Sequence, residues 1–222
     1  QVLTVKTKRS VHMAVLYFAI LAISASWLVE GNVKRELTSL KWSNCNPNRN
    51  SPITIQNVAV TPMPVAVPGN IHLTVDAKLN RTISHTSLKL SIKRKTLLLD
   101  IPIPCLFHVG SCTYDDLCNT VDQMMTEDWA GIMGNIGKQI RTMLSTQQVP
   151  DHCPVGPMEV HLNSYTLTLP PVPKILTFFA AGDYHAIATA TELATGEEVV
   201  CLDLTLSIKE NKTCSGISCI FG

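Results

Sequence analysis

Eight cysteines constrain this chain more than any other feature of its sequence, because their oxidation state decides whether they cross-link the fold or bind a metal. They are Cys45, Cys105, Cys112, Cys118, Cys153, Cys201, Cys214 and Cys219. An even number of cysteines in an exported chain predicts disulfides, whereas the same residues in a reducing compartment favour metal binding or catalysis. The compartment therefore has to be inferred first.

The beginning of the sequence has the order of features found in secretory signals. Basic residues precede an apolar run of about ten residues at 14–23, and small residues follow at 24–26. This run is too short to span a bilayer, and the order of charge, apolar run and small residues favours a signal over a buried core helix. We therefore predict a signal peptide over residues 1–26, with a possible true start at Met13 and upstream translation before it.

The rest of the chain is expected to form one exported domain. We predict a linker over residues 27–39, a domain over 40–209 and a C-terminal extension over 210–222. Two sequons, which begin at Asn80 and Asn211, are candidate glycosylation sites in such a protein. The net charge of the whole chain is +1 and no basic stripe occurs, so nucleic acid is not an expected partner.

Three of the cysteines, Cys105, Cys112 and Cys118, fall within fourteen residues and raise the question of a metal site. Structural zinc sites favour closely spaced Cys-x-x-Cys pairs, which this chain lacks, and a lone histidine such as His108 or His152 is rarely a ligand. We expect no metal site. The spacing favours a small loop closed by Cys105 and Cys112, while eight cysteines permit 105 pairings that the sequence alone does not decide between.

Alternating apolar and polar residues predict an all-β fold. Residues 71–79, 88–92 and 200–208 each alternate with period two, which is typical of strands that bury one face. Thr195 and Gly196 lie between two such segments and predict a hairpin turn. The phase of the alternation slips near Asn163, which indicates a bulge or bend.

Two helical stretches interrupt this pattern. The first is expected to begin at Thr113 as N-cap, and the second, within 127–146, has the strongest amphipathic periodicity in the chain. This second face either packs on the sheet or forms a lid that touches lipid or membrane, and periodicity does not distinguish the two. For lipid or membrane contact we select its apolar residues Trp129, Ile132, Met133 and Ile136.

The segment 170–182 is an apolar loop that follows a strand. Its prolines exclude a central strand, so its apolar side chains either pack inward or meet an apolar partner. Leu176, Phe178 and Phe179 are the candidates for lipid or membrane contact here. Together these features predict an antiparallel β-cup or sandwich with one or two short helices inserted.

Four segments carry a resemblance to a known family. They are KWSNCN at 41–46, TPMPVAVPGNIHLTV at 61–75, IPCLFHVGSCTYDDLC at 103–118 and HCP at 152–154. In these segments the chain resembles the ganglioside activator family, which has an ML-type lipid-recognition fold. The resemblance extends from about residue 40 to about residue 205 and implies that the β-cup encloses an apolar cavity.

The resemblance also implies disulfides. It pairs Cys45 with Cys201, Cys105 with Cys112, and Cys118 with Cys153. The chain departs from the family in lacking a further pair just before Cys153, where the amphipathic 127–146 stretch lies instead. Cys214 and Cys219 remain in the C-terminal extension, where we expect them to pair in a small disulfide loop.

The function implied by the resemblance is non-enzymatic. Members extract a glycosphingolipid such as a ganglioside from a membrane, which they contact transiently, and present it to a soluble glycosidase, a lysosomal β-hexosaminidase. The expected location is the secretory pathway, with the lysosome or the extracellular space as destination, and no cofactor is implied. A Trp129→Ala change is then expected to slow lipid extraction without unfolding the protein.

Two alternatives stay open. The chain could be a secreted carrier or sensor of another hydrophobic ligand, such as a phospholipid, a sterol or a signal lipid. It could also be a secreted lipid hydrolase, because Asp151, His152 and Cys153 are adjacent in the sequence. No G-x-S-x-G or H-E-x-x-H motif occurs, so we predict no catalytic residues.

Overall fold

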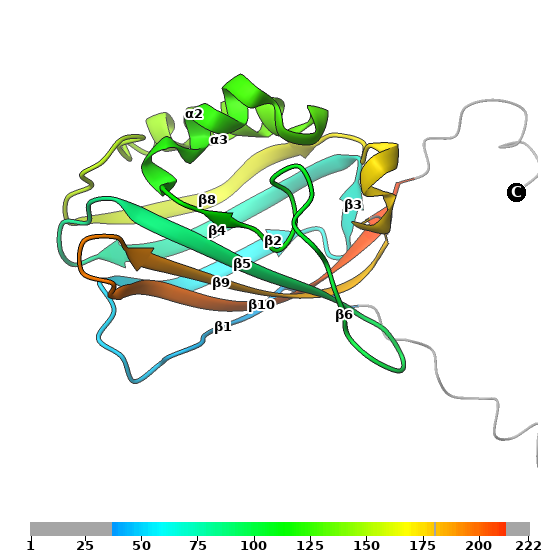
Figure 1. The fold of residues 1–222 in the computed structure, drawn as a ribbon, viewed down its shortest axis with the longest axis horizontal. Coiled ribbons are helices and arrows are strands. Elements are labelled where there is room, and N and C mark those ends of the chain that lie inside the picture. The colour runs from blue at the N-terminus through cyan, green and yellow to red at the C-terminus, as the bar shows by residue number, and fades with distance from the viewer. Residues whose placement is uncertain (1–36, 180, 212–222) are drawn as a thin grey trace, which may run out of the picture. The chain divides into compact units, whose positions relative to one another are not determined.

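The computed structural model describes residues 37–179 and 181–211, which form two facing, mostly antiparallel sheets with a helical hairpin along one side (Figure 1). This arrangement confirms the predicted all-β cup with inserted helices. The predicted signal peptide and the Cys214–Cys219 loop lie outside the described residues.

The larger sheet has seven strands in the order β1-β10-β9-β5-β6, with β3 paired to β10 and β7 paired to β5. Its strands are β1 (Lys41–Asn44), β3 (Val65–Val67), β5 (Thr86–Lys95), β6 (Ile101–Pro102), β7 (Thr113–Tyr114), β9 (Gly182–Glu192) and β10 (Glu198–Glu210). The hairpin predicted at Thr195–Gly196 joins β9 to β10, and Gly196 has the positive φ of 71° that such a turn needs.

The smaller sheet contains β2 (Ile53–Thr61), β4 (Gly69–Leu79) and β8 (Met158–Leu169), in the order β2-β4-β8. The pairing of β4 with β8 shifts between Leu73 and Val75, whose partners are Tyr165 and Leu162. One extra residue on β8 is therefore accommodated at 163–164, where Ser164 has a φ of 51°. The bulge predicted near Asn163 is confirmed.

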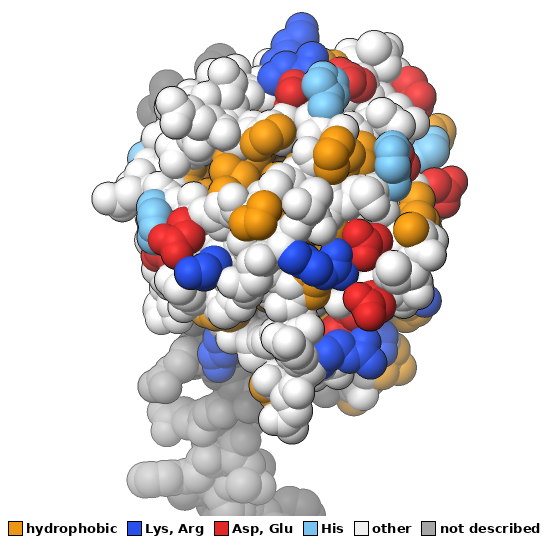
Figure 2. Space-filling model, turned by 90° about the vertical axis from the view of Figure 1, so that its left-hand side faces the viewer, with side chains coloured by type: hydrophobic (Ala, Val, Ile, Leu, Met, Phe, Trp, Pro, Cys, Tyr) orange, Lys and Arg blue, Asp and Glu red, His pale blue; other side chains and the backbone are white. Residues whose placement is uncertain are grey.

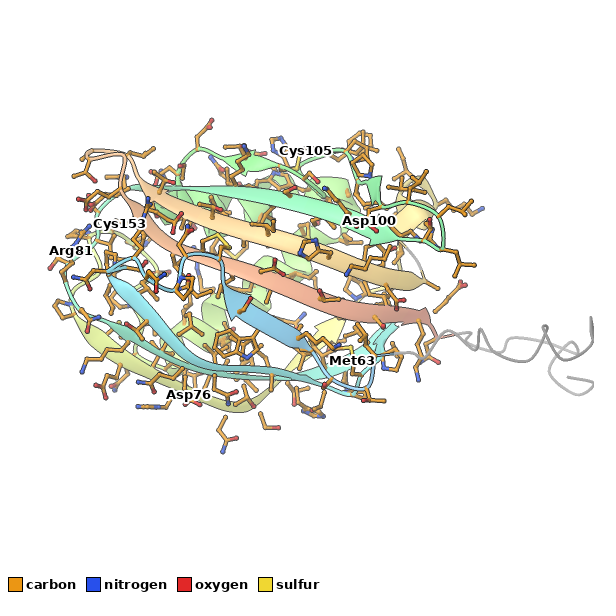
Figure 3. The ribbon with its side chains drawn as sticks, turned by 90° about the horizontal axis from the view of Figure 1, so that it is seen from below. Met63, Asp76, Arg81, Asp100, Cys105 and Cys153 are labelled. Carbon is orange, nitrogen blue, oxygen red and sulfur yellow. A yellow bond between two sulfur atoms is a disulfide. The ribbon has the colours of Figure 1, made fainter. Side chains whose placement is uncertain are left out.

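Strand register gathers the loops at two opposite ends. At the first, which we call the rim end, Gly69 pairs with Leu169 and Lys95 pairs with Asp183. At the second, the far end, Leu79 pairs with Met158. Figure 3 shows Met63 and Asp100 at the rim end, and Arg81 and Cys153 at the far end.

The helical hairpin consists of α2 (Leu117–Glu127), the 3-10 turn η1 (Trp129–Gly131) and α3 (Met133–Thr146). The predicted N-cap of the first helix was wrong: Thr113 lies in β7, and the Asp116 side chain accepts a hydrogen bond from the Cys118 N–H at 3.1 Å. An aspartate one residue before the helix can accept a hydrogen bond from this otherwise unpaired N–H. Thr113 cannot take this role because it pairs with Lys89 in the sheet.

Glycine allows the two helices to approach each other closely. A Cβ at Gly137 of α3 would lie 2.9 Å from the Met125 Cγ and 3.1 Å from the Met124 Cβ of α2. Gly137 therefore serves the packing of α3 against α2.

Polar side chains attach α3 to its neighbours. Gln139 Nε2 donates to the Thr168 carbonyl at 2.9 Å, and Gln139 Oε1 accepts from the Thr168 N–H at 2.7 Å, at the free edge of β8. Arg141 pairs with Asp122 of α2 and, at 3.2 Å, with Asp151 of the turn before β8. The hairpin thus bridges the gap beside β8 as a third wall (Figure 1).

Three disulfides join Cys45 to Cys201, Cys105 to Cys112 and Cys118 to Cys153. All three implied pairings are confirmed. The first ties β10 to the residue after β1, the second closes a short loop, and the third anchors the start of α2 to the turn before β8. The first two bridges thus belong to the larger sheet and its β6–β7 connection, and the third links the helical hairpin to the chain just before the smaller sheet's β8.

Two of these disulfides should stabilise the fold by different amounts, because they close loops of different length. Cys45 and Cys201 are 156 residues apart, whereas Cys105 and Cys112 are 7 apart. Chain-entropy estimates give about 5 kcal/mol for the long loop and about 2 kcal/mol for the short one. We expect Cys45→Ser/Cys201→Ser to lower the free energy of unfolding more than Cys105→Ser/Cys112→Ser, as measured by urea denaturation. Equal losses would contradict the assignment of the long bridge as the main covalent constraint.

Candidate lipid-binding site

The space between the sheets is only partly filled by side chains. Among the described residues, Leu176 and Val199 are the large side chains with the least exposure, at 1% each. Apolar residues that face inward, such as Leu73, Val75 and Val160, are half-buried. A tightly packed core would bury such residues, so their partial exposure indicates a hollow interior.

Small side chains on the central strand β9 contribute to this space. Ala190 lines the interior, and Ala186 and Ala188 occupy the same face by the two-residue period of a strand. They lie opposite leucine and isoleucine residues of β5, with Leu90 paired to Ala188. Alanine at three successive inward positions leaves room that larger residues would occupy.

The main apolar cavity has a volume of about 330 Å³ and extends toward the far end. This volume is within the range of small-molecule sites, and apolar atoms dominate its surface. Its walls come from both sheets, both helices and the Cys118–Cys153 bridge. Representative lining residues are Ile53, Leu79, Val121, Leu144, Met158 and Val200.

A second apolar cavity of about 110 Å³ lies between α3 and the inner face of the smaller sheet. It shares Leu144, Val149 and Val160 with the main cavity, so the two adjoin along α3. The amphipathic face of α3 therefore lines the interior: Met143 and Leu144 meet Leu73 of β4 across the smaller cavity. This placement provides an apolar site for a lipid tail.

Charged residues border the main cavity at the far end. Lys78, Asp151 and His152 are among its lining residues, and Figure 2 shows apolar side chains in the middle of this end with charged ones around them. Lys78 donates a 2.9 Å hydrogen bond to Glu159, which lowers the pKa of that carboxyl. His161 lies on β8, as Glu159 does. Its Nδ1 forms a 3.0 Å hydrogen bond with Asp76, and this bond raises the pKa of the imidazole.

Two of the three residues that suggested a hydrolase, Asp151 and Cys153, make structural contacts. Asp151 pairs with Arg141, and Cys153 is bonded to Cys118, so no thiolate nucleophile is present at this position. His152 lies 3.5 Å from Asp151 and is exposed.

One group of possible metal ligands occurs among the described residues. His85, Asp116 and Cys118 have ligand atoms within 4.8 Å of one another. The Cys118 sulfur is in a disulfide and cannot act as a thiolate ligand, while Asp116 caps α2 and lies 2.7 Å from the His85 Nδ1. This donor set fits a helix cap better than a metal centre.

Trp129 is buried, at 5% exposure, and does not lie on an amphipathic helix surface. Its ring stacks on His108 at 4.8 Å and on Tyr114 at 5.5 Å, and its Nε1–H donates to Glu127 at 2.7 Å. The indole is thus enclosed by protein side chains. This environment argues for a packing role and against the predicted membrane contact.

The other residues selected for lipid contact have different placements. Ile132, Met133 and Ile136 are half-buried at the α2–α3 turn and on the first turns of α3. Leu176 is buried in η2 (Lys174–Phe179), whereas the side chains of Phe178 and Phe179 lie outside the described set. Contact of these residues with lipid stays a prediction.

Both asparagines of the sequons are exposed. Asn80 donates to Thr54 at 3.3 Å and Asn211 donates to the Pro68 carbonyl at 3.2 Å. Their glycosylation stays a prediction.

An exposed apolar tip at the rim end was not predicted from the sequence. Leu97, Leu98 and Leu99 are 83%, 94% and 63% exposed in the loop between β5 and β6. Thr96 holds the loop in a turn, because its hydroxyl donates to the Leu99 carbonyl at 2.5 Å. The sequence does contain a signal for this tip, namely three consecutive leucines between Lys95 and Asp100. A search for period-two alternation does not detect such a run.

These features define a class of protein: an antiparallel β-cup whose hollow apolar interior is suited to a hydrophobic ligand. Residues 39–208 match the ML domain family, and the chain belongs to this family of lipid-recognition domains. No helix among the described residues is both long and apolar enough to cross a bilayer.

Two curated relatives are ganglioside GM2 activators. The Macaca fascicularis protein is 24% identical over 176 residues, which cover 79% of this chain and 86% of that protein. The Mus musculus protein is 22% identical over 175 residues, which cover 78% and 84%. Among solved structures, a Niemann-Pick type C2 protein from the Japanese carpenter ant aligns with a TM-score of 0.38 and 11% identity, covering 76% of this chain and 99% of that one. This slight likeness adds nothing to the assignment.

Filling the cavity should remove ligand binding while the fold persists. Val160 lines both apolar cavities, so Val160→Phe should occupy the space that a lipid tail needs. We expect binding of a fluorescent fatty-acyl lipid to weaken at least tenfold, with circular dichroism unchanged. Thr166→Phe, on the exposed face of the same strand, is the matched control. Unchanged binding by Val160→Phe would mean that these cavities do not hold the ligand.

The packing of Trp129 generates a different expectation from the one based on sequence. Trp129→Ala should destabilise the protein by about 3–5 kcal/mol, because it removes a large buried ring and its stacking partners. Urea unfolding monitored by circular dichroism measures this loss. A variant of unchanged stability that extracts lipid slowly would instead support membrane contact by this residue.

Proposed function

We propose that this protein is a non-enzymatic lipid-transfer protein that extracts a glycosphingolipid from a membrane and presents it to a soluble glycosidase. The observation that carries the proposal is the apolar cavity of about 330 Å³ held between the two sheets. The family supports a lipid ligand, and the names of the two ganglioside GM2 activators support a ganglioside or a related glycolipid.

The free energy of burying a lipid tail is compatible with a role as a lipid carrier. Each methylene removed from water contributes about 0.8 kcal/mol, whether it enters a bilayer or an apolar protein cavity. Exchange of a tail between the two environments is therefore nearly balanced, and extraction and release are both accessible. A hydrophobic cavity without a catalytic group suffices for this role.

The leucine tip supports contact with a membrane at the rim end. Leu97, Leu98 and Leu99 follow the basic residues Lys93, Arg94 and Lys95 of β5. Exposed apolar side chains next to cations favour a bilayer with anionic head groups, because the leucines enter the interface while the cations meet the lipid charge. Ile175, which is 55% exposed in η2, also lies at this end.

The proposal includes the wider setting of the protein. We place it in the secretory pathway, with the lysosome or extracellular space as its destination and a lysosomal β-hexosaminidase as a candidate partner. Disulfides at all six described cysteines support an oxidising compartment.

Transfer between vesicles tests the function. Purified protein is added to donor liposomes that contain a labelled ganglioside, and label in protein-bound and acceptor-liposome fractions is measured with time. We expect transfer proportional to protein concentration, no lipid cleavage by the protein alone, and faster cleavage when a β-hexosaminidase is added. Cleavage without the hydrolase would establish an enzyme, and transfer of phospholipid or sterol but not ganglioside would establish another carrier.

Removing the leucine tip should weaken membrane attachment specifically. We expect Leu97→Ser/Leu98→Ser to lower binding to anionic liposomes at least tenfold in a flotation assay, because two exposed leucines no longer enter the bilayer. Leu193→Ser is the matched control, since Leu193 is 53% exposed beside the β9–β10 turn at the far end. Equal effects of the two changes would exclude the tip as the attachment site.

A further inference from the structure

A third cavity, with both polar and apolar lining residues, lies beside the α2–α3 turn. It has a volume of about 410 Å³ and shares no lining residue with the two apolar cavities. We call it the turn crevice; it is lined by Met125, Asp128, Gly131, Ile132, Gly134, Asn135, Lys138, Thr168 and Pro170. Because Thr168 and Pro170 line it and β8 ends at Leu169, the crevice lies at the rim end.

Hydrogen bonds hold two of its polar side chains in place. Gln139, fixed to the Thr168 backbone, donates through Nε2 to Asn135 Oδ1 at 2.8 Å, which leaves the Asn135 amide hydrogens available as donors. Asp128 Oδ1 accepts from the Gly134 N–H at 2.8 Å, so its second oxygen remains available as an acceptor. Lys138 is exposed and forms no ion pair with any described residue.

The crevice therefore combines an amide donor, an ammonium donor and a carboxylate acceptor with no net charge. Sugar hydroxyls both donate and accept hydrogen bonds, so one hydroxylated ring can use all three groups. Met125, Ile132 and Pro170 add apolar surface for the C–H faces of such a ring. A phosphate is a poorer match, because the Asp128 carboxylate would repel it.

Residues of the same helix, α3, line both the turn crevice and the two apolar cavities. Lys138 lines the crevice, and Leu144, six residues later, lines both apolar cavities. At 1.5 Å per residue these two positions are about 9 Å apart along the helix axis. A lipid could thus place its tail in the cup and its head group at the rim, along one helix.

We propose that the turn crevice binds a neutral sugar ring in the head group of the lipid whose tail occupies the cup. This inference rests on the proposed function and adds to it a second contact, which selects glycosylated lipids over the same lipids without sugar. Asn135, Lys138 and Asp128 are the recognition residues.

Competition between two lipids with the same tails tests the proposal. Vesicles carry lactosylceramide or ceramide of identical acyl chain, and transfer is compared for the unmodified protein, Asn135→Ala/Lys138→Met and the control Lys89→Met on the exposed face of β5. Asp128 is left unchanged because its carboxylate accepts a hydrogen bond from the Gly134 N–H in the first turn of α3. We expect the double variant to lose about tenfold of the preference for lactosylceramide, with ceramide transfer and melting temperature unchanged.

A lipid-free measurement separates the inference from the proposed function. Free lactose is titrated into isotopically labelled protein, and the NMR signals of the Asn135 side-chain amide and the Gly131 and Gly134 backbone amides are followed. Shifts that saturate, and that the double variant lacks, support the subsite even if no lipid is transferred. Absence of these shifts, or an unchanged lactosylceramide preference in the double variant, would overturn it; failure to transfer either lipid would count against the proposed function alone.

Discussion

A cup that stays open when empty needs its walls held apart by something other than core packing. In most domains the burial of side chains against one another determines the distance between two sheets. Here the inward alanines of β9 leave space, and the helical hairpin connects the two sheets, because α3 contacts β8 of the smaller sheet and α2 contacts β5 of the larger one. The Cys118–Cys153 bridge and the Arg141 ion pairs hold that hairpin at the side of the cup. The remaining features of the site follow from this arrangement, since a filled interior would leave no room for a lipid.

Much of the fold could be predicted because its signals are local. Period-two alternation marked β4, β5 and β10, and a single phase slip at Asn163 marked the bulge in β8. Spacing favoured the short loop closed by Cys105 and Cys112. The other disulfide partners could not be obtained in this way, because spacing leaves many pairings open, and they came from resemblance to a family. Secondary structure depends on neighbours in the chain, whereas pairing of distant cysteines depends on the whole topology.

The candidate site was harder to predict, for a related reason. Periodicity showed that α3 has an apolar face, but only the packing shows that Met143 and Leu144 line the interior. Trp129 followed the same sequence pattern, yet the chain turns at Asp128 and Ala130, which have positive φ, and this turn moves the indole between His108 and Tyr114. The leucines at 97–99 have no alternation, so their exposure became apparent only in the structure.

The contact between Gln139 and Thr168 has a consequence for how this protein meets other chains. A primary amide presents the same donor and acceptor as a peptide group, so one side chain occupies both backbone positions of Thr168 that a neighbouring strand would use. The open margin of β8 is thereby blocked at this position against strand addition from another molecule. Because Leu97, Leu98 and Leu99 are already exposed, such a block leaves the protein with fewer routes to self-association.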